Sequence, residues 1–348
     1  RQSFMSQLHL NRYIRQVQCA KFGEESQQRL QTSRVFICGC GALGTTLANH
    51  LVRAGVGFVR LVDRDLVNLH NLHRQVLFDE ADAAQSLPKA IAAVEHLKRI
   101  NSEVSLEAIV ADVRPNNIDQ FAFDVDLILD ATDNFETRFL LNDYSLKHKI
   151  PWIFAACLST QGQVYPIIPG RTPCLRCLVP ELPLPGSVPT CEMAGILGPV
   201  VGVVASIQAM EAMKILAKKF DSVVPDLIAI DLWPFRIQQI KVQSLTTQEC
   251  PACHLGQYDY LSTVGLSLTT ELCGQKSVQI TPPCPAKCDL DHLSQQWSTL
   301  GTVERSPFFL RLRSAGWVLT LFPDGRAIID GINDVALARS IYAQFVGM

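Results

Sequence analysis

The chain has 348 residues, 48% hydrophobic and 18% charged, and its 31 basic and 33 acidic side chains give a net charge of −2. This length suits one large α/β domain with a small one beside it, or two medium domains. The charge argues against a general nucleic-acid binder, which needs a basic surface. The polar start, Arg1 to Ser6, is unlike a secretory leader, so we expect a cytoplasmic protein. In that compartment its twelve cysteines are expected to bind metal or act in catalysis rather than to pair as disulfides.

The first predicted elements form a βαβ unit. Residues 34–38 are an apolar run that ends in a loop containing Gly39, Gly41 and Gly44, and a helical stretch follows to about residue 54. A second apolar run ends at Asp63, 19 positions after the last glycine. Such a loop presents backbone N–H groups to phosphate, and the acidic residue can bind ribose hydroxyls. These features fit a dinucleotide and ATP equally, and a glycine turn without a ligand is the simpler alternative.

Strands and helices continue to alternate along the chain. The patterns predict helices over about 86–100 and 134–147, with strands at 125–130 and 151–156. This alternation predicts an α/β fold with a doubly wound, mostly parallel, Rossmann-like sheet, in which ligands bind beyond the carboxyl ends of the strands.

A proline-rich crossing segment follows, over about 166–189, and it leads into an uncharged stretch at 193–210. That stretch approaches the length of a membrane span. However, glycines and a proline interrupt its first half, and Glu211 and Lys214 follow at once. We therefore expect a loop that enters a buried helix over about 200–218, and no membrane span.

The remaining elements suggest two domains. Strands are predicted at 227–231 and 235–242, and a break follows. Beyond it we expect helices at 290–300 and 334–345, with strands at 308–313 and 317–322 and a turn at 323–325. The predicted organisation is therefore residues 1–255 as the nucleotide-binding domain, 256–270 as a linker, and 271–348 as a small α+β domain.

Three polar positions favour ATP over a dinucleotide. Arg74 follows the second strand, Lys89 begins the next helix, and Asp133 follows a buried strand. Attack on a triphosphate needs cations on its oxygens and a carboxylate to hold Mg²⁺, whereas hydride transfer by an NAD(P) oxidoreductase needs neither. Each residue also has an ordinary alternative: Lys89 as a solvated helix residue, and Asp133 as an N-cap.

The cysteines divide into groups by spacing. Cys174 and Cys177 form one Cys-x-x-Cys pair, and Cys250 and Cys253 form another after 72 intervening residues. Two such pairs complete a closed, four-thiolate structural zinc site that staples distant segments together; unrelated thiols are the alternative. Cys38 and Cys40 beside the glycine loop are interpreted as packing residues, and Cys284 and Cys288 in a proline-rich stretch as a weaker metal candidate.

Together these motifs resemble the ThiF/MoeB/HesA adenylyltransferases, which are bacterial relatives of ubiquitin-activating enzymes. The resemblance covers residues 10–253 and rests on five motifs: Arg12-Tyr-Ile-Arg-Gln16, Gly39-Cys-Gly-Ala-Leu-Gly44, Asn71-Leu-His-Arg-Gln75, Lys89 and Asp130-Ala-Thr-Asp-Asn134. Residues 272–280 and 322–326 resemble the C-terminal extension of longer, Bacillus-type ThiF proteins. No cysteine follows Cys288, so the tail is not a rhodanese-like domain.

The resemblance implies a site and a reaction. Gly41 and Asp63 would line the adenosine, and Asn134 belongs to the motif around the nucleotide. Asn71, Arg74 and Lys89 would bind the phosphates, Asp133 would bind Mg²⁺, and Arg15 would reach the phosphates of a partner subunit in a homodimer. The cysteine pairs match the family's structural zinc ligands. Cys191 matches a crossover-loop cysteine that can join covalently to the carrier protein; from sequence alone it is a small buried apolar residue.

The implied reaction is ATP-dependent adenylation of the C-terminal carboxylate of a ubiquitin-like (β-grasp) sulfur-carrier protein that ends in Gly-Gly. A ThiS-like carrier for thiamine biosynthesis is favoured, and a cysteine desulfurase or another donor would supply the sulfur. A MoaD-like carrier for molybdopterin synthesis, or a ubiquitin-like modifier, is the alternative. The chain itself ends in Val346-Gly-Met348 and is therefore not the carrier. A non-catalytic binding subunit and an NAD(P) oxidoreductase are the alternatives from other classes.

Overall fold

The computed structural model describes residues 12–183, 194–246, 249–262, 269–272, 276–282, 288–298, 300–314 and 316–346. The chain divides into two compact units, Arg1–Ser262 and Thr263–Met348. The division lies inside the stretch 256–270 that the sequence analysis assigns to a linker.

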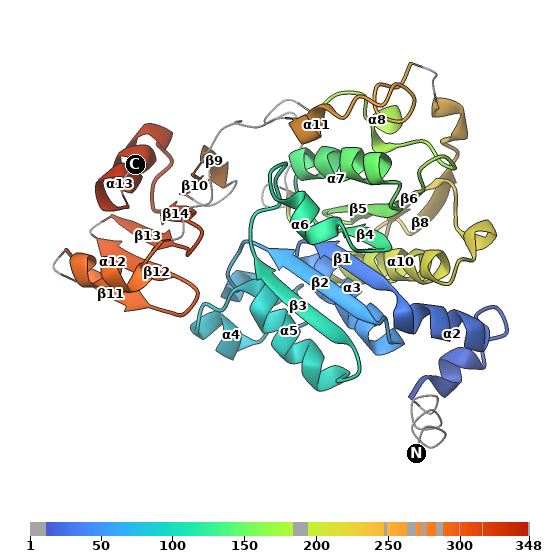
Figure 1. The fold of residues 1–348 in the computed structure, drawn as a ribbon, viewed down its shortest axis with the longest axis horizontal. Helices are drawn as coiled ribbons and strands as arrows, with labels where there is room; N and C mark the ends of the chain where they lie inside the picture. The colour runs from blue at the N-terminus through green and yellow to red at the C-terminus, as the bar shows by residue number, and fades with distance from the viewer. Residues whose placement is uncertain are drawn as a thin grey trace. The chain divides into compact units, whose positions relative to one another are not determined.

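The first unit is built on one eight-stranded sheet with the order β3-β2-β1-β4-β5-β6-β7-β8 (Figure 1). Its strands are β1 (Arg34–Cys38), β2 (Phe58–Asp63), β3 (Ser105–Val110), β4 (Leu127–Asp130), β5 (Trp152–Leu158), β6 (Gln161–Ile167), β7 (Leu227–Asp231) and β8 (Arg236–Ile240). The strands from β3 to β5 pair in parallel, and those from β5 to β8 pair antiparallel. The predicted doubly wound sheet is confirmed, and a hairpin after β5 extends it with antiparallel strands.

Helices cover both faces of this sheet. They are α2 (Gly23–Thr32), α3 (Ala42–Ala54), α4 (Glu80–Ala84), α5 (Lys89–Ile100), α6 (Ile118–Ala122), α7 (Phe135–His148), α8 (Leu175–Leu178), α10 (Gly198–Leu216) and α11 (Asp259–Ser262), with 3-10 turns η1 (Leu69–Asn71), η2 (Phe220–Ser222) and η3 (Gln243–Leu245). Because side chains alternate along a strand, Val35 and Ile37 of β1 pack with α3, α5 and α10, while Phe36 and Cys38 pack with α6 and α7. Figure 1 shows α7 and α3 on opposite sides of the strands.

Helix α10 is the one helix among the described residues that is long and apolar enough to cross a membrane. Its side chains Val204, Ala205 and Ala212 are fully buried in the core that it shares with α3 and β1. An apolar helix buried in this way is a core helix. The prediction of a buried helix here is confirmed.

The second unit is a six-stranded antiparallel sheet with the order β11-β12-β13-β14-β10-β9. Its elements are β9 (Thr269–Leu272), β10 (Ser277–Ile280), α12 (Leu290–Trp297), β11 (Thr302–Arg305), β12 (Leu310–Ser314), β13 (Trp317–Leu321), β14 (Ala327–Asp330) and α13 (Val335–Phe345). Leu312, Leu319 and Ile329 lie on one face of adjacent strands, and Trp297 of α12 and Ile341 of α13 belong to the same core. The predicted small α+β domain is confirmed.

Sequence patterns located six of the eight strands of the first sheet, all but β3 and β6. The predicted helix at 86–100 begins only at Lys89, because Pro88 lies at the N-cap with extended backbone and has no N–H to donate. No strand was predicted for β3, whose residues are only partly buried, so that its alternation of apolar and polar residues is weak. The short strands β6, β9, β10 and β11 were also not predicted.

A buried carboxylate on α7 gives the fold a measurable dependence on pH. The side chain of Asp143 is fully buried and accepts hydrogen bonds from Tyr260 N (3.1 Å) and Asn142 Nδ2 (3.3 Å). Burial raises the pKa of Asp143 to about 6, although these hydrogen bonds oppose the shift. Because the folded-state pKa lies above the unfolded one, protonation stabilises the fold at low pH, and this contribution is lost as pH rises through 6.

Asp143→Asn is therefore expected to stabilise the protein at pH 7.5 by about 2 kcal/mol. The substitution removes about 3 kcal/mol of desolvation cost of the buried charge and loses about 1 kcal/mol because one hydrogen bond is weakened. The advantage should shrink by about 1 kcal/mol at pH 5, where the wild-type carboxyl is protonated in the folded state. Urea unfolding at both pH values measures it. Asp259→Asn, which changes an exposed carboxylate bound to Arg176, is the control. An equal effect of Asp143→Asn at both pH values would contradict the expectation.

Candidate active site

The glycine loop joins β1 to α3 at the point where the strand order reverses. Gly39 has φ +97°, and a Cβ there would lie 2.6 Å from Ala131 O, while a Cβ at Gly44 would lie 2.1 Å from Gly39 O. These two glycines are required by packing. Gly41 differs, because a Cβ there would meet only Gln75 Nε2 at 3.8 Å. The space in front of Gly41 at the N-terminus of α3 therefore fits a ligand, and backbone N–H groups at a helix N-terminus favour an anionic one.

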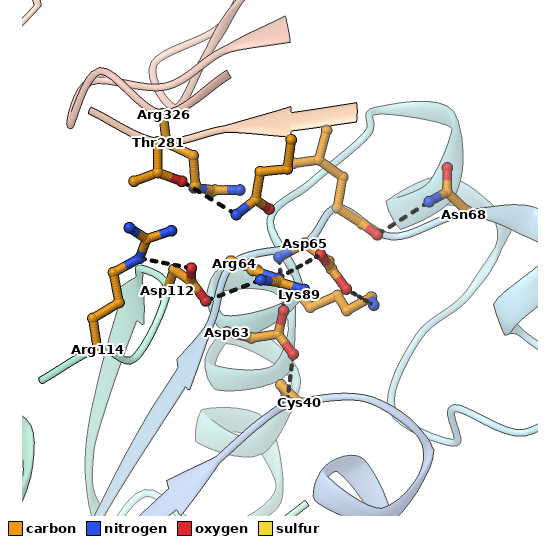
Figure 2. A network of polar contacts seen from close by, with 12 residues as sticks. Cys40, Asp63, Arg64, Asp65, Asn68, Lys89, Asp112, Arg114, Thr281 and Arg326 are labelled. Carbon is orange, nitrogen blue, oxygen red and sulfur yellow. Dashed lines mark hydrogen bonds and ion pairs between the residues drawn. The ribbon is translucent and has the colours of Figure 1, made fainter. Parts of the chain in front are cut away.

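Asp63 ends β2 and holds the glycine loop in place. One of its oxygens accepts from Cys40 N (2.6 Å) and the other from Asp65 N (2.7 Å) (Figure 2). Its side chain is mostly buried, and burial raises the pKa of Asp63 against the opposing charge of Lys89. The sequence predicted Asp63 as a ribose ligand. The structure adds that it fixes the backbone of the loop.

Lys89 is the first residue of α5 and lies beside Asp63 (Figure 2). Its side chain is only 9% exposed, and Nζ lies 2.8 Å from Asp65 Oδ2. The alternative of a solvated helix residue is therefore wrong for Lys89. Burial alone would lower the pKa of Lys89, but the charges of Asp65 and Asp63 outweigh burial and raise it. The group is an ammonium cation at neutral pH.

The segment that contains η1 lies against the same loop. Asn71 is buried, Arg74 is partly exposed and donates to His70 O (3.0 Å), and Gln75 is 3% exposed. Gln75 Oε1 is buried without a hydrogen-bond partner, and its Nε2 faces Gly41. A buried amide with an unsatisfied acceptor at the edge of an open space is a candidate ligand contact. The sequence analysis placed Gln75 in a motif but did not select it as a site residue.

The loop after β4 presents Asp133 to the same region. Its carboxylate is exposed and, among the described residues, makes no hydrogen bond or ion pair. The N-cap of α7 is Asn134, whose Oδ1 accepts from Thr137 N (2.8 Å). The alternative of Asp133 as the N-cap is therefore wrong. Asn134 keeps its Nδ2 group for a ligand, and the charge of Asp133 is close enough to raise the pKa of Lys89.

Buried polar residues hold this loop from beneath. Arg138 donates to Asp130 Oδ2 (3.1 Å), Thr132 O (2.7 Å) and Ala155 O (3.2 Å), and Gln208 of α10 donates to Asp130 O (2.8 Å). The sequence analysis missed Arg138 and Gln208. The only available signal was a charged or amide side chain on an otherwise apolar helix.

Arg15 lies at the opposite end of the first unit. Its neighbours Arg12 and Gln16 donate to Ile100 O (3.2 Å) and Ala54 O (3.0 Å), the last residues of α5 and α3. The glycine loop and Lys89 lie at the first residues of the same helices. Helices of 12 and 13 residues are about 18–20 Å long, so Arg15 cannot reach the phosphate residues of its own chain.

The four predicted metal-binding cysteines come together. Cys174 Sγ lies 3.8 Å from Cys177 Sγ and 3.6 Å from Cys250 Sγ, and Cys177 Sγ lies 3.5 Å from Cys253 Sγ. Tetrahedral zinc with Zn–S bonds of about 2.3 Å places its sulfur ligands about 3.8 Å apart. The cluster is therefore one that could hold a metal ion, and it joins the start of α8 to the end of the first unit.

The other predicted cysteines divide between packing and the undescribed part of the chain. Cys38 and Cys40 are buried in the two cores of the sheet, and burial raises the pKa of both thiols. They are packing residues, as predicted. Cys191 and Cys284 lie outside the described residues, so the roles suggested for Cys191 and for the pair of Cys284 with Cys288 stay predictions.

A cavity of about 570 Å³ opens between the β5–β6 turn, the start of α10 and the β7–β8 turn. Ser159, Thr160 and Asp231 line it together with residues 194–197 and Trp233. Its wall continues into Gly198, where a Cβ would lie 2.9 Å from His73 O. Apolar side chains are exposed along the neighbouring hairpin of β7 and β8: Trp233 is 80% and Phe235 75% exposed. An exposed apolar surface next to a cavity is typical of a site for a protein partner.

Comparison with known proteins agrees with this architecture. The model of the ThiF family matches residues 13–252. Over 337 residues the chain is 40% identical to the Bacillus subtilis (strain 168) protein named sulfur carrier protein ThiS adenylyltransferase, covering 97% of this chain and 99% of that protein. It is 37% identical over 249 residues to the Thermus thermophilus sulfur carrier protein adenylyltransferase, covering 70% and 90%. The E. coli MccB crystal structure with MccA-N7isoASN shares the fold, with a TM-score of 0.61 at 24% identity and coverage of 70% and 74%. The chain belongs to the ThiF family.

Proposed function

We propose that this chain is an adenylyltransferase that uses ATP to activate the C-terminal carboxylate of a small ubiquitin-like sulfur-carrier protein of the ThiS type. The observation that carries this proposal is the charge arrangement at the strand ends. Lys89 is held as a buried cation, and Asp133 presents a carboxylate that has no hydrogen bond or ion pair among the described residues, both near the open N-terminus of α3. The ThiS adenylyltransferase of Bacillus subtilis, which is similar over nearly the whole chain, supports the choice of carrier.

The site suits attack by a carboxylate on the α-phosphorus of ATP. An oxygen of the carrier's terminal carboxylate forms the new bond to phosphorus, and the bond to pyrophosphate breaks. The product is an acyl-adenylate, whose AMP group leaves readily when sulfur attacks. Lys89, Arg74 and Asn71 bind and orient the phosphates, so that catalysis comes mainly from positioning and charge neutralisation. The reaction requires no general base because the carboxylate is already ionised.

A magnesium ion would be held by Asp133, since a hard divalent cation prefers carboxylate oxygen and this carboxylate is exposed and unpaired among the described residues. It would supply charge neutralisation on the triphosphate. Asn134 caps α7 and Arg138 fixes the loop from below, so the residues of the chain determine where the carboxylate lies.

The cavity beside Gly198 supports a route by which the carrier's C-terminal tail enters the site. A flexible C-terminal tail without side chains, such as Gly-Gly, can pass through a narrow cavity toward Arg74. The exposed Trp233 and Phe235 supply an apolar docking surface at its outer edge. We propose that the carrier's folded part binds there, in the cytoplasm. A donor such as a cysteine desulfurase then supplies sulfur to the adenylated C-terminal carbonyl of the carrier, and AMP leaves.

The position of Arg15 supports a homodimer. This residue is exposed and, among the described residues, its side chain hydrogen-bonds only to Gln18 (3.1 Å), at the far end of the helices from the proposed phosphate site. If Arg15 binds phosphate, it binds the phosphate of a second copy. We propose that two copies associate so that each supplies Arg15 to the other's site.

We propose that the four-cysteine cluster holds one structural zinc ion. Four thiolates leave no open position, so the ion would contribute to stability and not to the reaction. Cys253→Ser is expected to abolish stoichiometric zinc binding and to lower the free energy of unfolding by about 3–4 kcal/mol, because the metal closes a long loop in the chain.

Zinc content by atomic absorption and unfolding in urea measure these two effects. Cys19→Ser, which changes an exposed thiol, serves as the control and should leave both unchanged. One zinc per chain in Cys253→Ser protein would contradict the assignment.

ATP–pyrophosphate exchange with Mg²⁺ tests the proposed function. Exchange is expected with a ThiS-like carrier and not with the same carrier lacking its terminal Gly-Gly. Exchange only with a MoaD-like carrier, or with a ubiquitin-like modifier, would transfer the proposal to that carrier class. A folded protein that binds the carriers but shows no exchange would be a non-catalytic binding subunit, and tight NAD(P) binding without ATP binding would indicate an oxidoreductase.

A further inference from the structure

Lys89 occupies a place that is unfavourable for a cation. It is the first residue of α5, where the helix dipole is positive, and the N-cap residue Pro88 offers no side-chain hydrogen bond. Its side chain is 9% exposed, so that water contributes little to solvating the charge. A lysine in such a place would lose its proton more easily than an ordinary one unless a neighbouring group compensates.

Asp65 supplies that compensation through two different groups. Its Oδ2 lies 2.8 Å from Lys89 Nζ, and its backbone carbonyl accepts from Lys89 N at 2.9 Å (Figure 2). Val67 N also donates to Leu87 O at 2.8 Å, so that residues 65–67 and 87–89 form a short antiparallel ladder. One residue therefore fixes both the backbone of Lys89 and the position of its ammonium group.

Asp63 contributes charge near Lys89 but makes no hydrogen bond to its ammonium group among the described contacts. Both of its oxygens accept backbone N–H groups, one from Cys40 of the glycine loop and one from Asp65. The other titratable groups whose charges interact with Lys89 are Asp133, Cys40 and His70. None of these has an ion pair or hydrogen bond to the Lys89 side chain among the described contacts; Asp65 alone has one.

We propose that Asp65 is a positioning residue for adenylation: its carboxylate and its carbonyl oxygen hold Lys89 charged and in place for the triphosphate. The inference rests on the proposed role of Lys89 in binding ATP. Asp65 itself touches no substrate. Its Oδ1 also lies 3.8 Å from Arg64 Nε, but its proposed effect on the reaction runs through the lysine. When the nucleotide binds, the ammonium group shares its three N–H donors between Asp65 Oδ2 and phosphate oxygen.

Asp65→Asn tests the proposal because it keeps the shape of the side chain and removes the charge. The rate at which acetic anhydride labels Lys89, followed by mass spectrometry from pH 7 to 11, is proportional to the fraction of the amine that has lost its proton, and it needs no turnover. In the variant this rate is expected to be tenfold or more higher at each pH in the range, because a lower pKa frees more of the amine. The kcat/KM for ATP in pyrophosphate exchange should then begin to fall at a lower pH than in the wild type.

Glu107→Gln is the matched control. Glu107 is 43% exposed and pairs with the buried Arg60 at 2.6 Å, as Asp65 is 41% exposed and pairs with the buried Lys89. The control loses an ion pair between a half-exposed carboxylate and a buried cation, although Arg60 keeps its second pair with Asp124 (2.7 Å). It should keep the wild-type labelling curve and pH profile. Its thermal unfolding also shows what the loss of such a pair does to stability alone.

Asp65→Glu is the second variant and should fold even if Asp65→Asn does not. It keeps the charge, so Lys89 should be labelled at the wild-type rate, but its longer side chain displaces the ammonium and should raise KM for ATP about tenfold. A labelling curve of Asp65→Asn that superimposes on the wild type would overturn the proposal, as would wild-type kinetics for Asp65→Glu. Absence of exchange in the wild-type enzyme would instead refute the proposed function, and the labelling result would still stand.

Discussion

Replacing Asp133 by alanine is expected to lower carrier-dependent ATP–pyrophosphate exchange by about a hundredfold to a thousandfold. The carboxylate is exposed in the loop after β4 and has no hydrogen bond or ion pair among the described residues, so the substitution breaks none there. The loss should therefore fall on magnesium and phosphate binding and not on stability. Exchange rates over a range of Mg²⁺ concentrations, together with thermal unfolding, measure the two effects separately.

Glu136→Ala is the control for this experiment. Glu136 is an exposed carboxylate in the first turn of α7, three residues beyond Asp133. It should leave exchange within a factor of two of the wild type, because it adds only a general negative charge near the site. Equal losses in the two variants would show that Asp133 has no specific role. A wild-type Mg²⁺ dependence in Asp133→Ala would lead to the same conclusion.

A heterodimer of an Arg15→Ala chain with a Lys89→Ala chain is expected to regain about half of the wild-type exchange activity, because a twofold symmetric pair then contains one complete site out of two. Each homodimer should retain less than about 1%, since every one of its sites lacks a cation for the phosphates. The physical reason is the length of α3 and α5, which separates Arg15 from Lys89 within one chain. Co-expression with two affinity tags and sequential purification yields the heterodimer.

Two results would count against the shared site. A heterodimer no more active than the homodimers would mean that Arg15 acts within its own chain or has no role in the reaction. A monomer that is fully active in exchange would exclude the dimer altogether. Sedimentation of the purified heterodimer before the assay establishes which case applies.

Sequence reasoning succeeded where a local pattern carries the structure. The apolar run at residues 34–38, the loop from Gly39 and the helix to Ala54 were predicted with the bounds that the structure has. The Cys-x-x-Cys spacing predicted the four-sulfur cluster because two ligands on one turn already lie at the right separation. Within the strand–loop–helix segment, and within each Cys-x-x-Cys pair, the residues that determine the structure are close in sequence.

The rest depends on contacts between distant segments. Asp65 and Lys89 are 24 positions apart, and no periodicity connects them. Asn134, and not Asp133, is the N-cap of α7. The sequence does not decide between these neighbours, because Asp and Asn are both favoured at N-caps and the choice depends on where the loop after β4 ends. The opposite placement of Arg15 and Lys89 follows only from the docking of residues 12–16 on the ends of two helices.

The cysteine cluster also determines how tension would travel through the chain. Cys250 and Cys253 precede α11 and the second unit in the chain, and their partners Cys174 and Cys177 lie ahead of α10, β7 and β8. With an ion bound, a pull on the second unit would detach α11, which is held by Asp143 and Arg176, and would then meet the metal–thiolate bonds. The intervening strands would then be mechanically shielded, and the molecule would extend under force as if these 72 residues were absent until the metal site ruptured.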